Sequence, residues 1–103
     1  MMQGDSYGLP IELLKADGSV LTAADVLEVE GTIGSLTKTY TDGGMTFSSA
    51  DNKWRMLLTQ EETLMFPNAR LKAQVRVKLK DGSVHGLSLG TIRVHESISK
   101  VVL

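Results

Sequence analysis

Residues 69–97 read ARLKAQVRVKLKDGSVHGLSLGTIRVHES, and this stretch decides the fold class. From Leu71 to Lys80, apolar residues alternate with lysine, arginine and glutamine. A period of two places the apolar side chains on one face of a strand and the polar ones on the other. The Asp81-Gly82 pair that follows is typical of a two-residue type I′ turn, in which both central residues have positive φ. We therefore expect one long antiparallel β-hairpin.

The return strand of this hairpin runs from Val84 to Val94, and its apolar pattern shifts by one residue across Gly90. A β-bulge at Gly90 accounts for the shift, because glycine is a usual residue at such a position. Beyond the hairpin, the apolar residues of the segment 95–103 fit two structures. The segment is either a short terminal strand or an apolar tail that docks on something.

Upstream of the hairpin, strand patterns recur between turn signals. The predicted strands are residues 7–15, 26–33, 36–41, 45–49 and 54–58, with a short extended piece at Val20-Leu21 and a tight or 3₁₀ turn at residues 22–25. Pro10 lacks an N–H group, so the first strand is expected at a sheet edge or with its start near Pro10. Trp54 has the largest apolar surface to bury and is the expected core anchor.

One short helix is expected before the hairpin. Residues 59–62, TQEE, spell a capping box, in which the Thr59 and Glu62 side chains each accept from the other's backbone N–H. The helix should cover residues 60–65, with Leu64 or Phe66 closing one end of the core. Strands spaced by about 8–12 residues favour an all-β, antiparallel immunoglobulin-like β-sandwich of about seven strands. A chain of 103 residues is expected to form one such domain, residues 1–103.

Composition excludes several functional classes. The chain has no cysteine, which removes disulfides, thiolate catalysis and thiolate-bound zinc. The net charge is −1 and aromatic residues make up 5%, so nucleic acid is not an expected partner. No apolar run approaches the roughly 18 residues of a membrane helix, and the N-terminus lacks a secretory-signal pattern. We expect no membrane association and no secretion by a signal peptide.

Residues with catalytic potential are scattered. His85 and His95 are ten residues apart, and a metal site there would need carboxylate ligands, so no metal and no cofactor is expected. Ser88 lies in a Gly-x-Ser-x-Gly sequence but within a strand pattern, not at a strand-to-helix elbow. We therefore assign no catalytic residue and expect that the protein is not an enzyme.

Glu28 and Glu30 share one strand face about 7 Å apart, within the range of paired catalytic acids. The favoured interpretation is that they pair across strands with the basic face that contains Arg76 and Lys78. A small hydrolase that uses the two glutamates stays an alternative. A second alternative, a carbohydrate-binding module, would need an exposed Trp54 beside Tyr40.

Several short motifs, taken in order, resemble a known family. They are Gln3-Gly-Asp-Ser-Tyr7, the Asp17-Gly18 turn, Leu58-Thr-Gln-Glu-Glu-Thr63, Lys72-Ala-Gln-Val-Arg-Val77, Asp81-Gly82 and Val94-His-Glu-Ser-Ile-Ser99. Together they are similar to small proteins of tailed phages and prophages of Gram-positive bacteria. The resemblance is to the amino-terminal, immunoglobulin-like domain of the siphophage baseplate upper protein. It implies a virion structural or assembly role, in the bacterial cytoplasm during assembly and in the virion if incorporated.

In the baseplate protein, this domain attaches a receptor-binding apparatus to the tail. The present chain ends at Leu103 with no coiled coil or distal domain, so we expect a free-standing adaptor or decoration-type module. Its expected partners are other phage structural proteins or further copies of the chain, with no small-molecule substrate. Exposed edge strands are candidate surfaces, because their unpaired backbone groups accept an added strand. The candidate partner-binding residues are Gln3, Gly4, Asp5, Ser6, Ile98, Val101, Val102 and Leu103.

Overall fold

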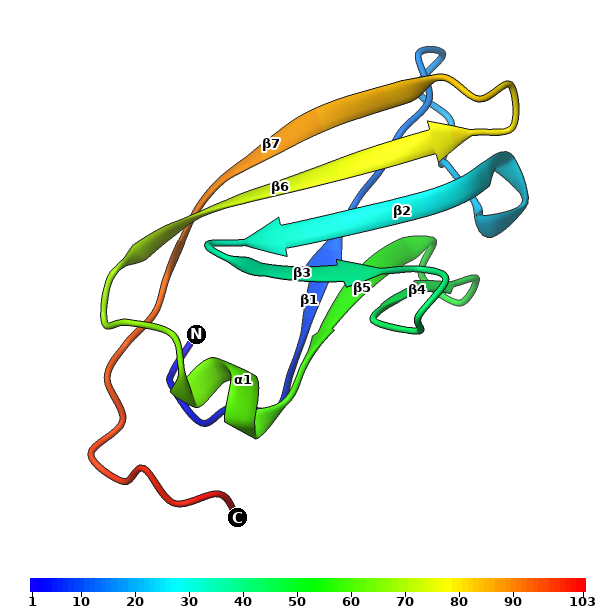
Figure 1. Ribbon diagram of the computed structural model, residues 1–103. Helices are drawn as coiled ribbons and strands as arrows, with labels where there is room; N and C mark the ends of the chain where they lie inside the picture. Colours follow the sequence, from blue (N-terminus) through cyan, green and yellow to red (C-terminus); the bar gives the residue numbers. More distant parts are fainter.

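Two antiparallel β-sheets pack face to face in the computed structural model, which describes all residues, 1–103 (Figure 1). One sheet has the order β1-β5-β4 and the other β3-β2-β6-β7. In the lettering of immunoglobulin domains these are strands B-E-D and C′-C-F-G, without strand A. The predicted all-β sandwich is confirmed. The strands are β1 (Tyr7–Ile11), β2 (Val26–Ile33), β3 (Leu36–Thr39), β4 (Met45–Ser48), β5 (Lys53–Leu58), β6 (Arg70–Leu79) and β7 (Val84–Arg93).

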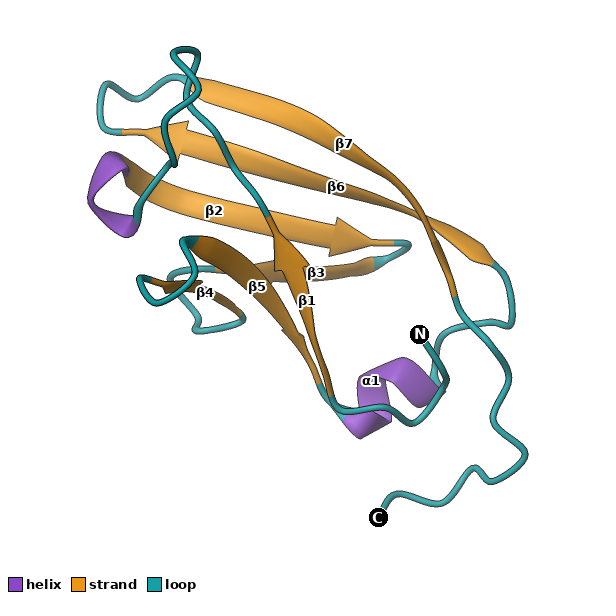
Figure 2. Ribbon diagram, turned by 180° about the vertical axis from the view of Figure 1, so that it is seen from behind, coloured by secondary structure: helices purple, strands orange, loops and turns teal.

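Two short helical elements join the strands. A 3₁₀ turn, η1 (Ala23–Asp25), precedes β2, and α1 (Gln60–Leu64) carries the chain from one sheet to the other between β5 and β6 (Figure 2). The predicted capping box is present: Thr59 Oγ1 accepts from the Glu62 N–H at 3.2 Å, and Glu62 Oε1 accepts from the Thr59 N–H at 2.9 Å. Of the two side chains proposed to close the core, Phe66 is buried and Leu64 is only partly so.

Trp54 anchors the core, as the sequence predicts. Its side chain is fully buried between the sheets, and its Nε1 donates to the Leu21 carbonyl at 2.8 Å. Tyr40 packs edge-on against the indole with ring centroids 5.4 Å apart, and Phe47 lies at 5.3 Å. A buried indole N–H needs such a partner, so the Leu21 carbonyl fixes the loop before η1 to the core.

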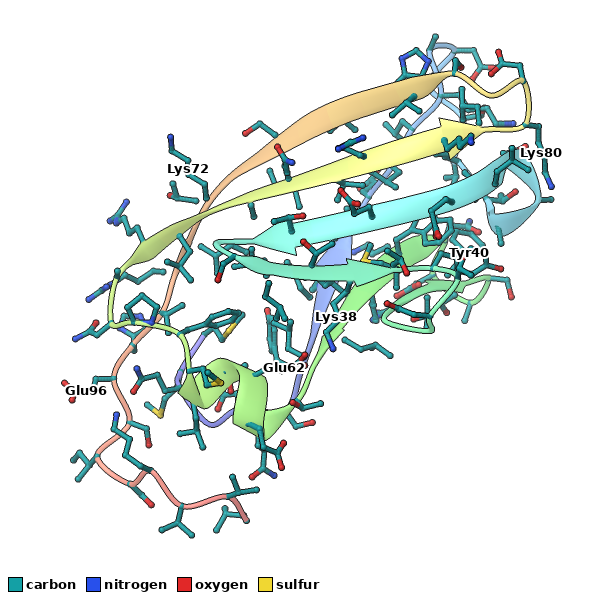
Figure 3. All side chains as sticks on the ribbon, in the orientation of Figure 1. Lys38, Tyr40, Glu62, Lys72, Lys80 and Glu96 are labelled. Carbon is teal, nitrogen blue, oxygen red and sulfur yellow. The ribbon has the colours of Figure 1, made fainter.

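The alternation along β6 produces the expected two faces. Ala73, Val75 and Val77 are buried, whereas the lysine and arginine side chains of β6 are exposed, and Lys72 points away from the other sheet (Figure 3). Glu30 lies opposite Arg76 in the β2–β6 register, and their charged groups are 3.8 Å apart. The predicted pairing of β2 acids with β6 bases is thus realised at Glu30.

The hairpin turn is not the predicted two-residue type I′ turn. Gly82 has φ of +86°, but Asp81 has no positive φ. The Gly82 N–H donates to the Leu79 carbonyl and the Leu79 N–H to the Ser83 carbonyl, both at 2.9 Å, which makes a three-residue loop. Such a loop combines a type I turn with one left-handed residue, and glycine adopts that conformation without a Cβ clash. The predicted β-bulge at Gly90 is confirmed by a register shift at Ala73/Gln74 and a φ of +80°.

Two strands end earlier than the sequence suggests. The first, predicted over residues 7–15, ends at Ile11, the last residue paired with β5. The chain then leaves that sheet, and Leu14 makes an isolated bridge to Val20 instead. The strand predicted over residues 36–41 ends at Thr39, the last β3 residue that pairs with β2.

Candidate interaction surface

The N-terminal residues predicted to bind a partner are built into the fold. Gln3 is buried, its Nε2 donates to the Phe66 carbonyl at 2.6 Å, and its N–H donates to the His95 carbonyl at 2.9 Å. The Asp5 carbonyl accepts from Thr63 Oγ1 at 2.8 Å. Gly4 lies against the Leu64 side chain, and Ser6 alone of the four is exposed. Residues 3–5 therefore hold α1 and the chain termini together.

Residues 96–103, here called the C-terminal tail, form no strand. Two glutamines hold the tail by polar contacts. Gln3 Oε1 accepts from the Ser97 N–H at 3.2 Å and also from Lys100 Nζ. Gln60 Oε1 accepts from the Leu103 N–H at 2.7 Å, and Gln60 Nε2 donates to the Leu103 carbonyl at 3.3 Å. The segment is therefore not a terminal strand, and polar contacts hold it on its own domain.

The apolar side chains of the tail face solvent. Ile98 and Leu103 are fully exposed, Val101 is 70% exposed and Val102 is 44% exposed. The tail runs past α1 at the end of the molecule where the N-terminus also lies (Figure 1). Because its anchors are polar groups, the tail gains little apolar burial from its own domain. Of the predicted residues, Ile98, Val101 and Leu103 present most of their apolar surface to solvent, and Val102 is partly covered.

A second exposed surface is the edge of the four-stranded sheet at β7. The other three edge strands are guarded: β1 contains Pro10, and β3 and β4 are four residues each. Short edges and edge prolines are devices that prevent strand addition. In contrast, β7 has ten residues without proline, lysine or acid, and only the bulge at Gly90 interrupts it. The segment of β7 before Gly90 is therefore the least protected edge.

An apolar groove of about 600 Å³ opens beside this part of β7. It lies between the ends of β6 and β7 and the loop that joins β1 to η1. No strand A covers the inner face of β7, and Leu87 on that face is consequently 49% exposed. The larger apolar side chains of the lining are Leu13, Leu14, Leu21, Val77, Leu79 and Leu87.

Two turns of the same sequence stand at the end of the molecule where the groove lies. Asp17-Gly18-Ser19 and Asp81-Gly82-Ser83 are each followed by valine, and Gly18 and Gly82 both have φ of +86°. In each turn the serine N–H and hydroxyl both donate to the aspartate Oδ1. These hydrogen bonds lower the pKa of Asp17 and Asp81. The repeat is visible in the sequence, but sequence reasoning did not connect it to a groove.

Charged groups line the mouth of the groove. Lys15 forms a salt bridge with Asp25 at 3.3 Å, and hydrogen bonds from Thr22 chiefly lower the pKa of Asp25. Lys80 and Asp81 also line the groove but form no salt bridge. The mouth of the groove thus offers one cation, Lys80, and one anion, Asp81, that form no salt bridge, beside an apolar floor.

The scattered residues with catalytic potential are not brought together. Burial raises the pKa of Glu28, but hydrogen bonds from Thr41 lower it, and the net effect is a decrease. Glu28 Oε1 accepts from the Thr41 N–H at 3.0 Å. Glu30 faces Arg76. Ser88 Oγ accepts from the Gly90 N–H at 3.2 Å. No group of three or more histidine or acidic side chains is placed to hold a metal ion.

The carbohydrate-binding alternative required an exposed Trp54, and the structure buries this side chain completely. No helix of the structure has the length and hydrophobicity needed to cross a bilayer. Comparison of the chain with protein-family models, with curated proteins and with solved structures finds no match. The tail, the β7 edge and the groove are therefore the features from which a function is inferred.

Proposed function

We propose that this chain is a non-enzymatic structural or assembly module of a tailed phage or prophage particle that acts by protein–protein interaction. The resemblance of its motifs to the amino-terminal domain of the siphophage baseplate upper protein supports the assignment to a particle. The immunoglobulin-like sandwich is compatible with it, although this fold hosts many functions. The protein would act as a baseplate- or tail-associated adaptor or decoration.

The observation that carries the proposal is the outward-facing C-terminal tail. Water-exposed apolar groups contribute about 25 cal/mol per Å² when a partner buries them. Contiguous exposed apolar surface is uncommon on monomeric proteins and marks interaction sites. The polar anchors at Gln3 and Gln60 hold the tail in place while leaving Ile98, Val101 and Leu103 free for a partner.

The state of the acidic residues supports a role without catalysis. Glu28 accepts backbone hydrogen bonds and Glu30 faces an arginine, so each carboxylate is used in the fold. A general acid needs a raised pKa near the working pH, whereas that of Glu28 is lowered by hydrogen bonding despite the opposing effect of burial.

The test uses phage particles from a lysogen or host that carries the coding sequence. Particles purified on a density gradient should contain the chain, measured by quantitative mass spectrometry, in a fixed ratio to the tail proteins. Deleting the coding sequence should give particles with incomplete tails or lower infectivity. Particles that lack the chain in the wild type, and that stay complete and infectious after the deletion, would overturn the proposal.

A further inference from the structure

We propose that the C-terminal tail of one copy binds in the apolar groove of a second copy, alongside β7, so that the chains associate head to tail. This inference rests on the proposed function, because it names the partner of the same interaction module. It is carried by the position, chemistry and charge of the two surfaces.

The two surfaces lie at opposite ends of an elongated molecule. The principal extents are 46 × 23 × 21 Å. The tail lies near α1 and the N-terminus, whereas the groove lies by the β6–β7 turn at the other end of the long strands (Figure 1). The tail therefore reaches a groove only in a neighbouring copy. A contact between two different patches is heterologous, so it builds rings or filaments instead of a closed twofold dimer.

The shape of the tail suits an added strand. In an extended chain successive side chains point to opposite faces, so Val101 and Leu103 share one face. A tail paired with β7 before the Gly90 bulge can direct both side chains towards Leu87 and the groove floor. Its backbone then satisfies the unpaired groups of the β7 edge, as in other cases of β-strand addition. The exposed tail and the open edge of β7 would thus cover each other.

Charge favours this orientation. Lys100 directly precedes Val101 and its only salt-bridge partner is Glu96, at 3.8 Å, with both side chains largely exposed. Asp81 lies at the groove mouth beside Lys80, and neither side chain forms a salt bridge. A tail whose valine and leucine enter the groove brings a lysine to the mouth that holds this free aspartate. Opposite charges at the rim of an interface mainly raise specificity and the association rate.

Release of residues 100–103 breaks few hydrogen bonds within the chain. The two between Gln60 and Leu103 are solvent-exposed, and water or the β7 edge replaces them. The bond from Lys100 Nζ to Gln3 Oε1 is also given up, whereas the bond from the Ser97 N–H to the same oxygen can remain. The exchange of one set of backbone hydrogen bonds for another leaves apolar burial as the net gain. We therefore expect association that strengthens with protein concentration.

The test measures molar mass by light scattering across a concentration series. The wild type should form species larger than a monomer. A tail variant, Val101→Asp/Leu103→Asp, and a groove variant, Leu87→Lys, should each remain monomeric. An equimolar mixture of the two variants should give a dimer and nothing larger, because one intact tail then meets one intact groove. Val84→Lys is the matched control, since Val84 is exposed on β7 and does not line the groove.

Charge reversal provides a second test. Lys100→Glu and Asp81→Lys should each weaken association, and the two changes combined in one chain should restore it.

A third measurement avoids substitutions in the folded domain: a synthetic peptide of residues 96–103 is titrated into isotope-labelled Val101→Asp/Leu103→Asp protein. The backbone resonances of Leu14, Leu79 and Leu87 should shift.

A wild type that is monomeric at every concentration, a mixture without a dimer, or a peptide that shifts no groove resonance would overturn the head-to-tail contact. A chain that stays monomeric but is found in purified particles would refute this contact and leave the proposed function standing. A chain that assembles with itself but is absent from particles would support this contact and refute the proposed function.

Discussion

The side-chain amide of Gln60 pairs with both backbone groups of Leu103. Gln60 Oε1 accepts from the Leu103 N–H at 2.7 Å, and Gln60 Nε2 donates to the Leu103 carbonyl at 3.3 Å. Neighbouring strands of a sheet make the same pair of hydrogen bonds through their backbones, whereas here one side chain makes both. It holds the end of the tail by its backbone and leaves the Leu103 side chain fully exposed.

Gln60→Ala should release the end of the tail without unfolding the domain. Amide hydrogen exchange at Leu103 should become faster, because its acceptor is lost. The free energy of unfolding, measured by urea titration, should change by less than about 0.5 kcal/mol, since these bonds are exposed and water replaces them. Gln74→Ala, on the exposed face of β6, should leave exchange at Leu103 unchanged. Unaltered exchange in Gln60→Ala would show that the pair does not hold the tail.

Gln3→Ala should destabilise the whole domain. Gln3 Nε2 is buried and donates to the Phe66 carbonyl at 2.6 Å. Removing the donor leaves a carbonyl without its partner beside the core, which costs roughly 1–3 kcal/mol. Urea unfolding followed by far-ultraviolet circular dichroism measures the change, again with Gln74→Ala as the control. Equal stability of the two variants would contradict a structural role for the N-terminal segment.

Trp54→Phe should cost about 2–4 kcal/mol, because it leaves a cavity in the core and removes the hydrogen bond to the Leu21 carbonyl. Tyr40→Phe is a suitable control, since Tyr40 is 37% exposed and the change keeps the ring that packs against Trp54. Thermal unfolding measures both variants. In the wild type, fluorescence from Trp54 should shift to longer wavelength on unfolding and should not respond to added oligosaccharides. A native emission typical of exposed indole would place Trp54 outside the core.

The salt bridge between Asp51 and Arg55 should make stability fall with acidity. The hydrogen bond from Arg55, with Nη2 2.5 Å from Asp51 Oδ2, chiefly lowers the pKa of Asp51 from 3.8 to about 2. A carboxylate with a lowered pKa contributes stability above its unfolded pKa, and the contribution is lost as pH falls through the folded value.

Asp51→Asn should therefore be less stable than the wild type above pH 3.8, and the difference should shrink as pH falls to about 2. Urea midpoints across this range test the expectation. Glu61→Gln, on the exposed face of α1, controls for the simple loss of a negative charge. A difference that is constant with pH would mean that Asp51 is not stabilised by Arg55.

Local residue patterns are enough to predict α1, the position of most strands and the fold class. The alternation from Leu71 to Lys80 specifies a two-faced strand, because a period of two in polarity has only one arrangement that buries the apolar side chains. The Thr59 and Glu62 pair specifies the start of α1, since a capping box is made within four consecutive residues. Trp54 was identified as the core anchor because burial of its large side chain is strongly favoured.

Which surfaces remain uncovered depends on contacts between segments that are far apart along the chain. The tail is apolar in sequence, but whether it joins a sheet depends on Gln3 and Gln60, which lie far from it along the chain. Leu87 and Leu13 form one groove because residues 12–25 cross beside the β6–β7 turn and no strand lies outside β7. The two-residue turn predicted at Asp81-Gly82 was wrong for a local reason. Hydrogen bonds from Ser83 to Asp81 favour a three-residue loop, and the alternation of apolar and polar residues carries no information about such side-chain contacts.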